Sequence, residues 1–398
     1  MTVESGYVSA ARRVLTGRAV TARYAAPVLT AYLLTRLIVC TLVFVSLVVL
    51  PVRVAPSLST HFPNLVVDGL VRWDGFHYAN IALHGYDRMK TAFFPLYPLL
   101  VASLRVIVGN VYVAGLLVSN AALLVALGYV YALARREYDQ ACATRTVFYL
   151  ATAPGSVFFS AMYTESLFVA LVAATFYHAR SAQWSRAALA GGLAAATRNT
   201  GVVLAAVIAL EGLHQAGVRV RPQARCVRAL WSHVRLQGRR FVDARYALAA
   251  SAIVPIGLLS YMAFLGHAFH DPLAFLHVEA LWGKRVSLSN LMHILPQGHL
   301  TVANQLDILV TLALAPLVLS VCRRMRPAYV VFTLVSFLLP LDTGGTGGMT
   351  RYVLMLVPCY LLLGSLVRRP GLDRLILCLS LALMAFVTVT FCHWGGPN

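Results

Sequence analysis

The sequence contains few charged residues for its length. Only 12% of the 398 residues are charged and 59% are hydrophobic, and the mean hydropathy is +0.74, whereas about a quarter of the residues in a soluble domain are charged. Apolar stretches of about 17 to 25 residues recur along the chain, the length needed to cross a hydrocarbon core of roughly 30 Å. This excludes a soluble multi-domain enzyme. It predicts an all-α, polytopic membrane protein in which residues 1–398 form a single integral membrane domain.

The sequence also lacks the motifs of several common sites. Its seven cysteines are scattered and none belongs to a CxxC pair, so neither a disulfide framework nor a thiolate metal site is indicated. It contains no GxGxxG sequence and no Walker loop, so no soluble nucleotide-binding site is expected.

Acidic residues are scarce, and the net charge is strongly positive. The chain has 33 Lys and Arg against 14 Asp and Glu, a formal net charge of +19, which in a soluble protein would suggest nucleic-acid binding. However, 23 of the 33 basic residues fall in six expected loops or tails. These are residues 12–23, 135–145, 180–186, 219–245, 323–326 and 368–374. This is the positive-inside bias of cytoplasmic loops, so we expect contact with membrane lipid and no nucleic-acid partner.

The basic loops define a topology of about eleven crossings with the N-terminus in the cytoplasm. Residues 26–50 are too long for the apolar region of a cleaved signal peptide and are interpreted as a first span that runs outward. Residues 51–110 then form the first extracytoplasmic loop, in which residues 93–108 are expected to lie as a helix at the outer interface. Residues 214–245 form a basic cytoplasmic loop and residues 267–301 a second long outer loop.

One apolar segment, residues 186–213, is interrupted by Thr197-Arg198-Asn199-Thr200-Gly201. As a single crossing it would place the following arginine-rich loop outside the cell. We therefore expect two short helices that meet at the interruption, in the outer half of the membrane. Broken backbone is tolerated at that depth only where it is buried in protein or lines a wet cavity.

The run from Trp73 to Tyr86 stands out because it holds an acid, two histidines and four aromatic residues. In a helix, Asp74 and His77 would share a polar stripe beside a stripe that begins with Trp73. One interpretation is an interfacial amphipathic helix with an ordinary aromatic belt. The other makes Asp74 a general base that takes a proton from an attacking hydroxyl. Metal ligation by Asp74 with His77 is a weaker, two-ligand indication.

Several short motifs occur in order along the chain. They are Trp73-Asp74 with His77-Tyr78, Ala92-Phe93-Phe94-Pro95-Leu96-Tyr97-Pro98, Tyr163-Thr164-Glu165-Ser166, Thr197-Arg198 with Gly201, Asp271-Pro272-Leu273-Ala274-Phe275 with Trp282-Gly283, and Met349-Thr350-Arg351-Tyr352. Each is weak alone, but the ordered set resembles the PIG-V-like mannosyltransferases. These are relatives of GPI mannosyltransferase 2 within the GT-C class of membrane glycosyltransferases.

The resemblance implies a GT-C-like fold and a transferase that takes a hexose, with mannose favoured, from a lipid-phosphate donor on the extracytoplasmic face. It implies that Asp74 corresponds to an essential aspartate in the first outer loop. The donor is dolichyl-phosphate-mannose in eukaryotic relatives, and a polyprenyl-phosphate sugar is expected in a bacterial member. The acceptor is expected to be a glycolipid or glycan. Transfer from a β-linked donor to an α-linked product would be inverting. Some GT-C enzymes need a divalent metal ion and others do not, so a metal cofactor stays open.

Because the basic residues are almost all arginine, a GC-rich coding sequence and hence a bacterial cytoplasmic membrane are favoured. The active site would then lie on the outer face of that membrane.

Arginines are expected to bind the donor phosphate, because the leaving group gains negative charge. Arg198, at the helix interruption, is the first candidate and Arg351 the second. The alternative for Arg198 is an ion pair with Glu165. Arg36, inside the first span, is expected only to pair with a neighbouring helix.

The remaining candidate residues are expected to contact substrate. They are Trp73, His77, Tyr78, Glu165, His270, Asp271 and Tyr352. Glu165 stands at the start of an expected helix, so capping that helix is the favoured role and ordering the mouth of the cleft the alternative. The glycine-rich segment 344–348 is interpreted as a turn rather than a phosphate cradle.

Two other classes of function compete with a transferase. A lipid or sugar transporter, or flippase, would also have many spans, broken helices and a buried arginine, but internal repeats and polar residues near the midplane are more typical of that class. The chain shows no convincing repeat, and its polar residues gather at the expected outer face. A non-enzymatic partner of another transferase would not depend on Asp74.

Overall fold

The computed structural model describes residues 4–50, 60, 62–218, 244–283 and 301–393. Within these ranges every regular element is helical, which confirms the all-α prediction. Most of the predicted basic loop 214–245 and part of the predicted outer loop 267–301 lie outside the described residues.

Within the described residues, five helical segments are long and apolar enough to cross a membrane. They are residues Ala25–Val49 of α1 (Glu4–Val49), α5 (Val111–Glu137), the segment Arg245–Phe269 formed by α11 (Arg245–Ile253) and α12 (Ile256–Phe269), Asn304–Arg324 of α14 (Val302–Arg324), and α18 (Pro370–Cys392). A sixth candidate is the pair Met349–Met355 and Val357–Leu366, which bends by 76° at its break. The prediction of about eleven crossings is therefore not confirmed.

The difference arises because several predicted spans are broken into shorter helices. The predicted interruption is confirmed: α8 (Trp184–Ala195) is separated from α9 (Leu204–Gln215) by the short helix η4 (Asn199–Val203). A second apolar segment is likewise divided into α6 (Gln140–Ala151), a turn and the short helix η3 (Ser156–Phe159). Twelve residues of α-helix extend about 18 Å, which is short of a bilayer core.

The remaining helices complete the bundle. They are α2 (Leu65–Leu70), α3 (Asp74–His84), η2 (Arg88–Lys90), α4 (Leu96–Val108), α7 (Glu165–Arg180), α13 (Ala274–Leu281), α15 (Pro327–Gly344), α16 (Met349–Tyr352), η6 (Val353–Met355) and α17 (Val357–Leu366). Helix α4 is the segment predicted to lie at the outer interface, and its location there stays a prediction.

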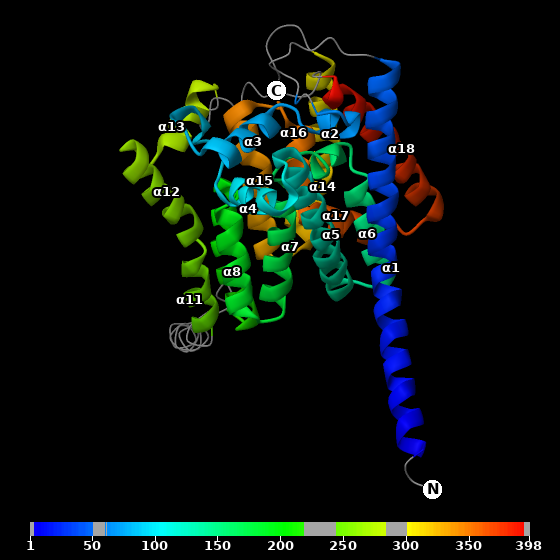
Figure 1. The fold of residues 1–398 in the computed structure, drawn as a ribbon. Helices are drawn as coiled ribbons and strands as arrows, with labels where there is room; N and C mark the ends of the chain where they lie inside the picture. Colours follow the sequence, from blue (N-terminus) through cyan, green and yellow to red (C-terminus); the bar gives the residue numbers. More distant parts are fainter. Residues whose placement is uncertain (1–3, 51–59, 61, 219–243, 284–300, 394–398) are drawn as a thin grey trace, which may run out of the picture.

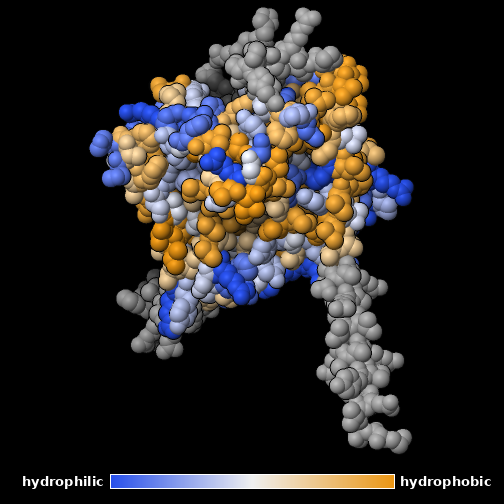
Figure 2. Space-filling model, in the orientation of Figure 1, coloured by the Kyte–Doolittle hydropathy of each residue, from blue (hydrophilic) through white to orange (hydrophobic). Residues whose placement is uncertain are grey.

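The helices are arranged around α7, which packs against α5, α8 and α9. Helices α1 and α18 lie together at one edge of the bundle and α11 and α12 at the opposite edge (Figure 1). Hydrophobic side chains cover much of the middle of the visible face, and hydrophilic ones gather toward its upper left and lower edges (Figure 2). This is the surface expected of a helical membrane protein.

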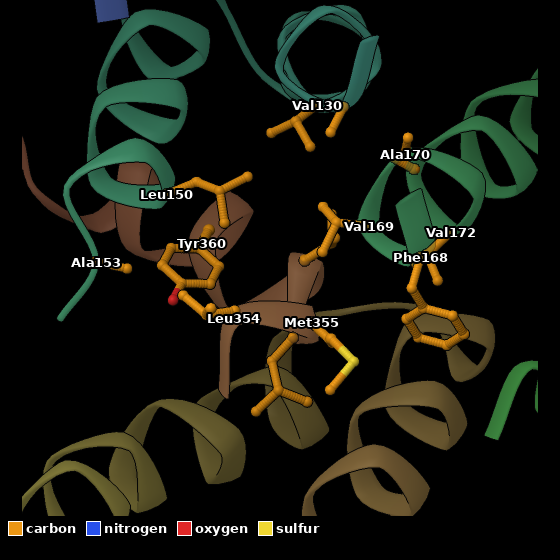
Figure 3. Close-up of a cluster of buried hydrophobic side chains, with 14 of the residues drawn as sticks. Val130, Leu150, Ala153, Phe168, Val169, Ala170, Val172, Leu354, Met355 and Tyr360 are labelled. Carbon is orange, nitrogen blue, oxygen red and sulfur yellow. The ribbon is translucent and has the colours of Figure 1, made fainter. Parts of the chain in front are cut away.

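A continuous apolar core joins the central helices. Val130 of α5, Leu150 of α6 and Val169 of α7 are buried together with Leu354 of η6 and Tyr360 of α17 (Figure 3). Arg36 of α1 reaches into the same interior, where its guanidinium donates to Ser160 Oγ at 2.6 Å and to the carbonyl of Ser156 at 3.1 Å. Arg36 thus joins α1 to the segment around η3, as predicted.

Four charged residues gather where α5, α7 and α9 approach the start of α15. We call this group the inner centre; it consists of Glu137, Arg180, Glu211 and Arg326. Arg180 forms an ion pair with Glu137, and Glu211 Oε1 accepts from Arg180 at 2.8 Å and from Arg326 at 3.2 Å. The helix ends that were predicted to share the cytoplasmic side therefore lie together. The end of the bundle that contains the inner centre is called the inner end below, and the opposite end the outer end.

Candidate active site

The candidate site begins at the start of α3, at the outer end of the bundle (Figure 1). Trp73 precedes the helix with φ +49° and ψ −116°, an uncommon conformation for a residue with a bulky side chain. Backbone strain of this kind persists only where the surroundings impose it, and it is frequent at functional sites. Asp74 is the first residue of α3, so the strained residue directly precedes the predicted base.

The turn before Asp74 is held by the buried residue Arg72. Its guanidinium pairs with Asp68 Oδ2 at 2.8 Å and donates to the carbonyl of Cys392 in α18 at 3.1 Å. The carbonyl of Arg72 accepts from Tyr163 Oη at 3.2 Å. Asp74 is therefore carried by a turn that is fixed to two distant parts of the chain.

Four charged side chains meet at this point. We call them the outer centre; they are Asp74, Glu165, Arg198 and Arg351. Arg351 donates to Asp74 Oδ2 at 2.5 Å and also pairs with Glu165 Oε1. The same Glu165 oxygen accepts from Arg198 at 2.9 Å. The pair between Arg198 and Glu165, predicted as the alternative for this arginine, is thus present.

Aromatic rings orient both arginines. The Arg351 guanidinium lies 4.7 Å from the centroid of the Tyr163 ring, and the Arg198 guanidinium lies 5.6 Å from that of Tyr352. A cation above an aromatic face is attracted by the quadrupole of the ring. The two guanidinium groups are therefore held by planar contacts as well as by Glu165.

The turn that carries Arg351 is anchored by Asp307, a fully buried residue of α14. The carboxylate of Asp307 accepts from the backbone N–H of Gly348 at 2.8 Å and from that of Thr350 at 2.7 Å. A Cβ atom at Gly155 would lie 2.3 Å from the carbonyl oxygen of Thr350, so glycine is required there for the close approach. The N–H group of Thr350 is thus hydrogen-bonded to Asp307, and its carbonyl group packs against Gly155. Arg351 follows Thr350 directly in the chain.

A cavity of about 410 Å³ adjoins the outer centre, which is within the range of small-ligand sites. Its lining includes both arginines and Asp74, together with Trp73, Tyr78, Asn199, Glu279, Trp282, Gly347, Gly348 and Tyr352. Gly348 has φ +77°, so the predicted glycine turn is present beside the cavity. A smaller cavity of about 190 Å³ shares Arg198, Asn199, Glu279 and Tyr352 and is otherwise mostly apolar.

Some predicted substrate residues lie apart from this lining. His77 stacks on Phe93 with ring centroids 4.8 Å apart. Asp271 accepts from His277 at 2.8 Å and pairs with Arg88 at 3.4 Å, and the hydrogen bond from His277 holds the pKa of Asp271 below its usual value. His270 ends α12 with φ +56°. Contact between these residues and substrate stays a prediction.

Sequence reasoning missed three residues of the site. Asp307 and Glu279 were assigned no role, although Asp307 is an acid in an apolar segment and such an acid is a signal of function by default. Tyr163 belongs to the motif Tyr163-Thr164-Glu165-Ser166, but it was assigned no role. Among the residues that the structure describes, no group of three His, Cys, Asp or Glu side chains that could hold a metal ion occurs.

Comparison with known families gives one match, to a family described as mannosyltransferase (PIG-V), over residues 15–234. No protein of curated function matches the sequence. Among solved structures, the chain is similar to the oligosaccharyltransferase AglB from Archaeoglobus fulgidus in complex with an inhibitory peptide and dolichol-phosphate, with a TM-score of 0.47, 12% identity and coverage of 92% of this chain and 56% of that chain. A structure of the A. fulgidus oligosaccharyltransferase with Zn and sulfate gives a TM-score of 0.43, 15% identity and coverage of 92% and 53%. The chain therefore spans about half the length of these structures.

Proposed function

Because the chain belongs to the PIG-V mannosyltransferase family, we propose that it transfers mannose from a polyprenyl- or dolichyl-phosphate donor to an extracytoplasmic glycolipid or glycan. The observation that carries the proposal is the convergence of Asp74, Arg198 and Arg351 on one cavity. Residues far apart in the sequence supply an acid and two cations to the same space. Transfer of a sugar from a phosphate needs both kinds of group.

In the proposed reaction, Asp74 is the general base. The oxygen of the acceptor hydroxyl attacks the anomeric carbon of the donor, and the bond from that carbon to the phosphate oxygen breaks. The hydroxyl proton passes to the carboxylate of Asp74, and the bonding electron pair leaves with the phosphate. A carboxylate is ionised at neutral pH and can accept this proton. A single displacement inverts the configuration, so a β-linked donor gives an α-linked product.

Arg198 and Arg351 stabilise the phosphate in this proposal. The leaving group changes from a phosphate diester to a monoester and gains negative charge, which arginine neutralises with paired N–H donors. Arg351 also pairs with Asp74 at 2.5 Å. A donor phosphate would compete with Asp74 for Arg351, so donor binding would turn the carboxylate toward the acceptor hydroxyl.

The test is a transfer assay with the purified full chain in liposomes. The probes are polyprenyl-phosphate-mannose labelled in the sugar and a set of glycolipid acceptors, with GDP-mannose as the control donor. We expect label in the acceptor from the lipid-linked donor alone, with an α-linkage by NMR. Movement of labelled donor across the bilayer without any transfer to an acceptor would instead support the transporter alternative.

Arg198→Ala separates donor binding from the rest of the reaction. Loss of one of two phosphate cations should weaken affinity for the lipid-phosphate sugar by roughly tenfold or more, as measured by competition with a fluorescent donor analogue. Arg186→Ala is the matched control, because Arg186 is exposed near the start of α8, donates to Gln183 at 3.3 Å and does not line the cavity. Unchanged donor affinity in Arg198→Ala would remove this residue from the proposed phosphate site.

The proposed orientation places the cavity on the outer face of a bacterial cytoplasmic membrane. His84 lies at the end of α3, and Arg186 lies near the start of α8. An impermeant thiol reagent added to intact cells should label His84→Cys above the parent level and leave Arg186→Cys unlabelled until the cells are opened. The opposite pattern would reverse the topology.

A further inference from the structure

A second, larger cavity lies at the inner end of the bundle, between α1 and α5. Its volume is about 840 Å³, and it is lined by Ala25, Val28, Leu29, Leu124, Gly128, Tyr131, Ala132, Arg135, Arg136 and Tyr177. We call it the α1–α5 groove. None of these residues belongs to the outer centre or lines the 410 Å³ cavity.

The α5 side of the groove is a single stripe of the helix. Leu124, Gly128, Tyr131 and Arg135 follow one another at spacings of three or four residues, which places them on one face. From Leu124 to Arg136 the helix rises about 18 Å at 1.5 Å per residue. The apolar thickness of one leaflet is about 15 Å, half of the bilayer core. The groove is therefore about as long as an acyl chain in one leaflet.

Charge is confined to one end of this stripe. Arg135 and Arg136 are in the last turn of α5, whereas the rest of the α5 and α1 lining is apolar apart from Tyr131. On the α1 side, Ala25 begins the apolar segment Ala25–Val49. Arginines and the start of an apolar span at the same end are the arrangement expected at a membrane–water interface.

Glu137, the acid next to Arg136 in sequence, is bound within the inner centre. Glu137 pairs with Arg180 and accepts from Tyr329 Oη at 3.1 Å, within the inner centre. Arg136 donates from Nη2 to the carbonyl of Arg180 at 2.7 Å, but a guanidinium has five N–H donors, so others remain for a ligand. Arg136 thus presents positive charge to whatever fills the groove.

Gly128 shows that the groove has room at its middle. A Cβ atom at this position would meet nothing within 4 Å, although glycine is unfavourable inside a helix by about 1 kcal/mol relative to alanine. Its φ is not in the left-handed region, so the backbone does not require glycine. The absent side chain instead leaves a notch in the wall of the groove.

We propose that the α1–α5 groove binds an anionic glycerophospholipid of the leaflet at the inner end, with its phosphate against Arg135 and Arg136 and an acyl chain along Leu124 and Gly128. Length, apolar lining and a basic end match the three parts of such a lipid. Basic pockets between membrane helices are known to select anionic headgroups. This inference does not depend on the proposed transferase activity.

The test measures lipid binding to the delipidated full chain in detergent by native mass spectrometry. The probes are phosphatidylglycerol and phosphatidylethanolamine with identical acyl chains. We expect the first phosphatidylglycerol to bind roughly 10- to 30-fold more tightly than phosphatidylethanolamine, the effect of two arginines near a phosphate. Equal binding of the two lipids by the parent would overturn the proposal.

Three variants locate the binding. Arg135→Gln with Arg136→Gln should remove the preference for phosphatidylglycerol. Gly128→Leu keeps both arginines and should weaken binding of both lipids by filling the notch, so it decides the question if the double variant fails to fold. Arg323→Gln with Arg324→Gln, in the last turn of α14, is the matched control and should behave like the parent. Undiminished binding in Gly128→Leu would contradict the proposal.

A last arm distinguishes the lipid from the transferase substrate. Undecaprenyl phosphate, which also carries an anionic phosphate, should displace phosphatidylglycerol from the parent only at higher concentration. Displacement at lower concentration would assign the groove to a polyprenyl carrier and overturn the proposal of a glycerophospholipid.

Discussion

The outer and inner centres have the same pattern of ion pairs. In each, one buried glutamate joins two arginines through its Oε1 atom: Glu165 joins Arg198 to Arg351, and Glu211 joins Arg180 to Arg326. The side chains of these glutamates are 0% and 2% exposed. Within the described part of the chain, the Oε2 atom of each has no hydrogen-bond partner. A second acid then pairs with one arginine of each centre.

The centres differ in what surrounds the second acid. Asp74 in the outer centre is 28% exposed and lines a 410 Å³ cavity. Glu137 in the inner centre is 12% exposed and accepts a hydrogen bond from Tyr329. Burying ion pairs costs desolvation energy that a well-packed apolar contact would not. The comparison indicates that the shared pattern fixes helices in both places, and the access to Asp74 is the reason that we propose the outer centre as the site of chemistry.

The largest expected effect is on the stability of the inner centre. Glu211→Gln leaves Arg180 and Arg326 without a shared anion, and removing one partner of a buried pair costs about 3–5 kcal/mol. We expect a lower free energy of unfolding in detergent, with transfer per folded molecule within about twofold of the parent. A fall in transfer per folded molecule well beyond twofold would contradict the separation of roles.

Glu165→Gln is the corresponding change in the outer centre. It should also destabilise the fold, but the two arginines at the cavity would lose their common anchor. A misplacement of about 1 Å at a catalytic group costs on the order of 100-fold in rate, so transfer per folded molecule should fall by roughly that factor. If Glu165→Gln and Glu211→Gln lowered the specific rate equally, the two centres would not differ as proposed.

Asp307 tests whether the turn of Arg351 needs its anchor. Asp307→Ala removes both acceptors for Gly348 and Thr350, and we expect a roughly tenfold lower kcat from the displaced arginine. Asp307→Asn, which keeps one oxygen acceptor, should recover part of the loss.

Thr311→Val is the control for Asp307. Thr311 Oγ1 donates to the Asp307 carbonyl one turn along the same helix, whereas the N–H groups of Gly348 and Thr350 donate to the Asp307 carboxylate. If Thr311→Val lowered kcat as much as Asp307→Ala, the loss in Asp307→Ala would reflect a general disturbance of α14 and not the loss of the anchor for Arg351.

The smallest expected effect concerns the pH dependence of stability, through the ion pair between Arg72 and Asp68 of α2. Burial alone would raise the pKa of Asp68, but hydrogen bonds from Arg72 and Thr60 outweigh it and lower the pKa. The folded state thus favours the ionised form, and the associated stability is present above the unfolded pKa of about 3.9 and lost as pH falls through the lower folded value. Asp68→Asn should lose about 1 kcal/mol at pH 7 and lack that acid-dependent step in unfolding curves.

Asp87 provides the comparison for this step, because its side chain is 54% exposed, against 16% for Asp68. Surface pairs contribute about 0–1 kcal/mol, so Asp87→Asn should leave the unfolding curve close to that of the parent. A larger effect for Asp87→Asn than for Asp68→Asn would contradict the importance of burial.

The sequence predicted features that depend on local pattern. The helix carrying Asp74, the break around Arg198 and the glycine turn near Gly348 are all present. Each is marked by a nearby composition change, a polar run in an apolar segment or a cluster of glycines. The alternative pair of Arg198 with Glu165 also followed from the rule that a cation within a membrane segment needs a partner.

Features that depend on tertiary packing were not predicted. Asp74 and Arg351 are 277 positions apart, and Asp307 and Thr350 are 43 apart, so no local pattern connects them. The predicted number of crossings is not confirmed for a related reason. Hydropathy measures apolar length, whereas helices such as α6 and α9 can end inside the protein when neighbouring elements bind their terminal backbone groups.

The most direct test of the account is the rate of sugar transfer by Asp74→Asn. Asparagine has nearly the same shape as aspartate but cannot take the acceptor proton, so single-turnover transfer from bound polyprenyl-phosphate-mannose should fall by roughly 100-fold or more. The affinity for the donor, measured in the same preparation, should change far less. A variant that binds the donor and transfers mannose as fast as the parent would show that Asp74 is not the base.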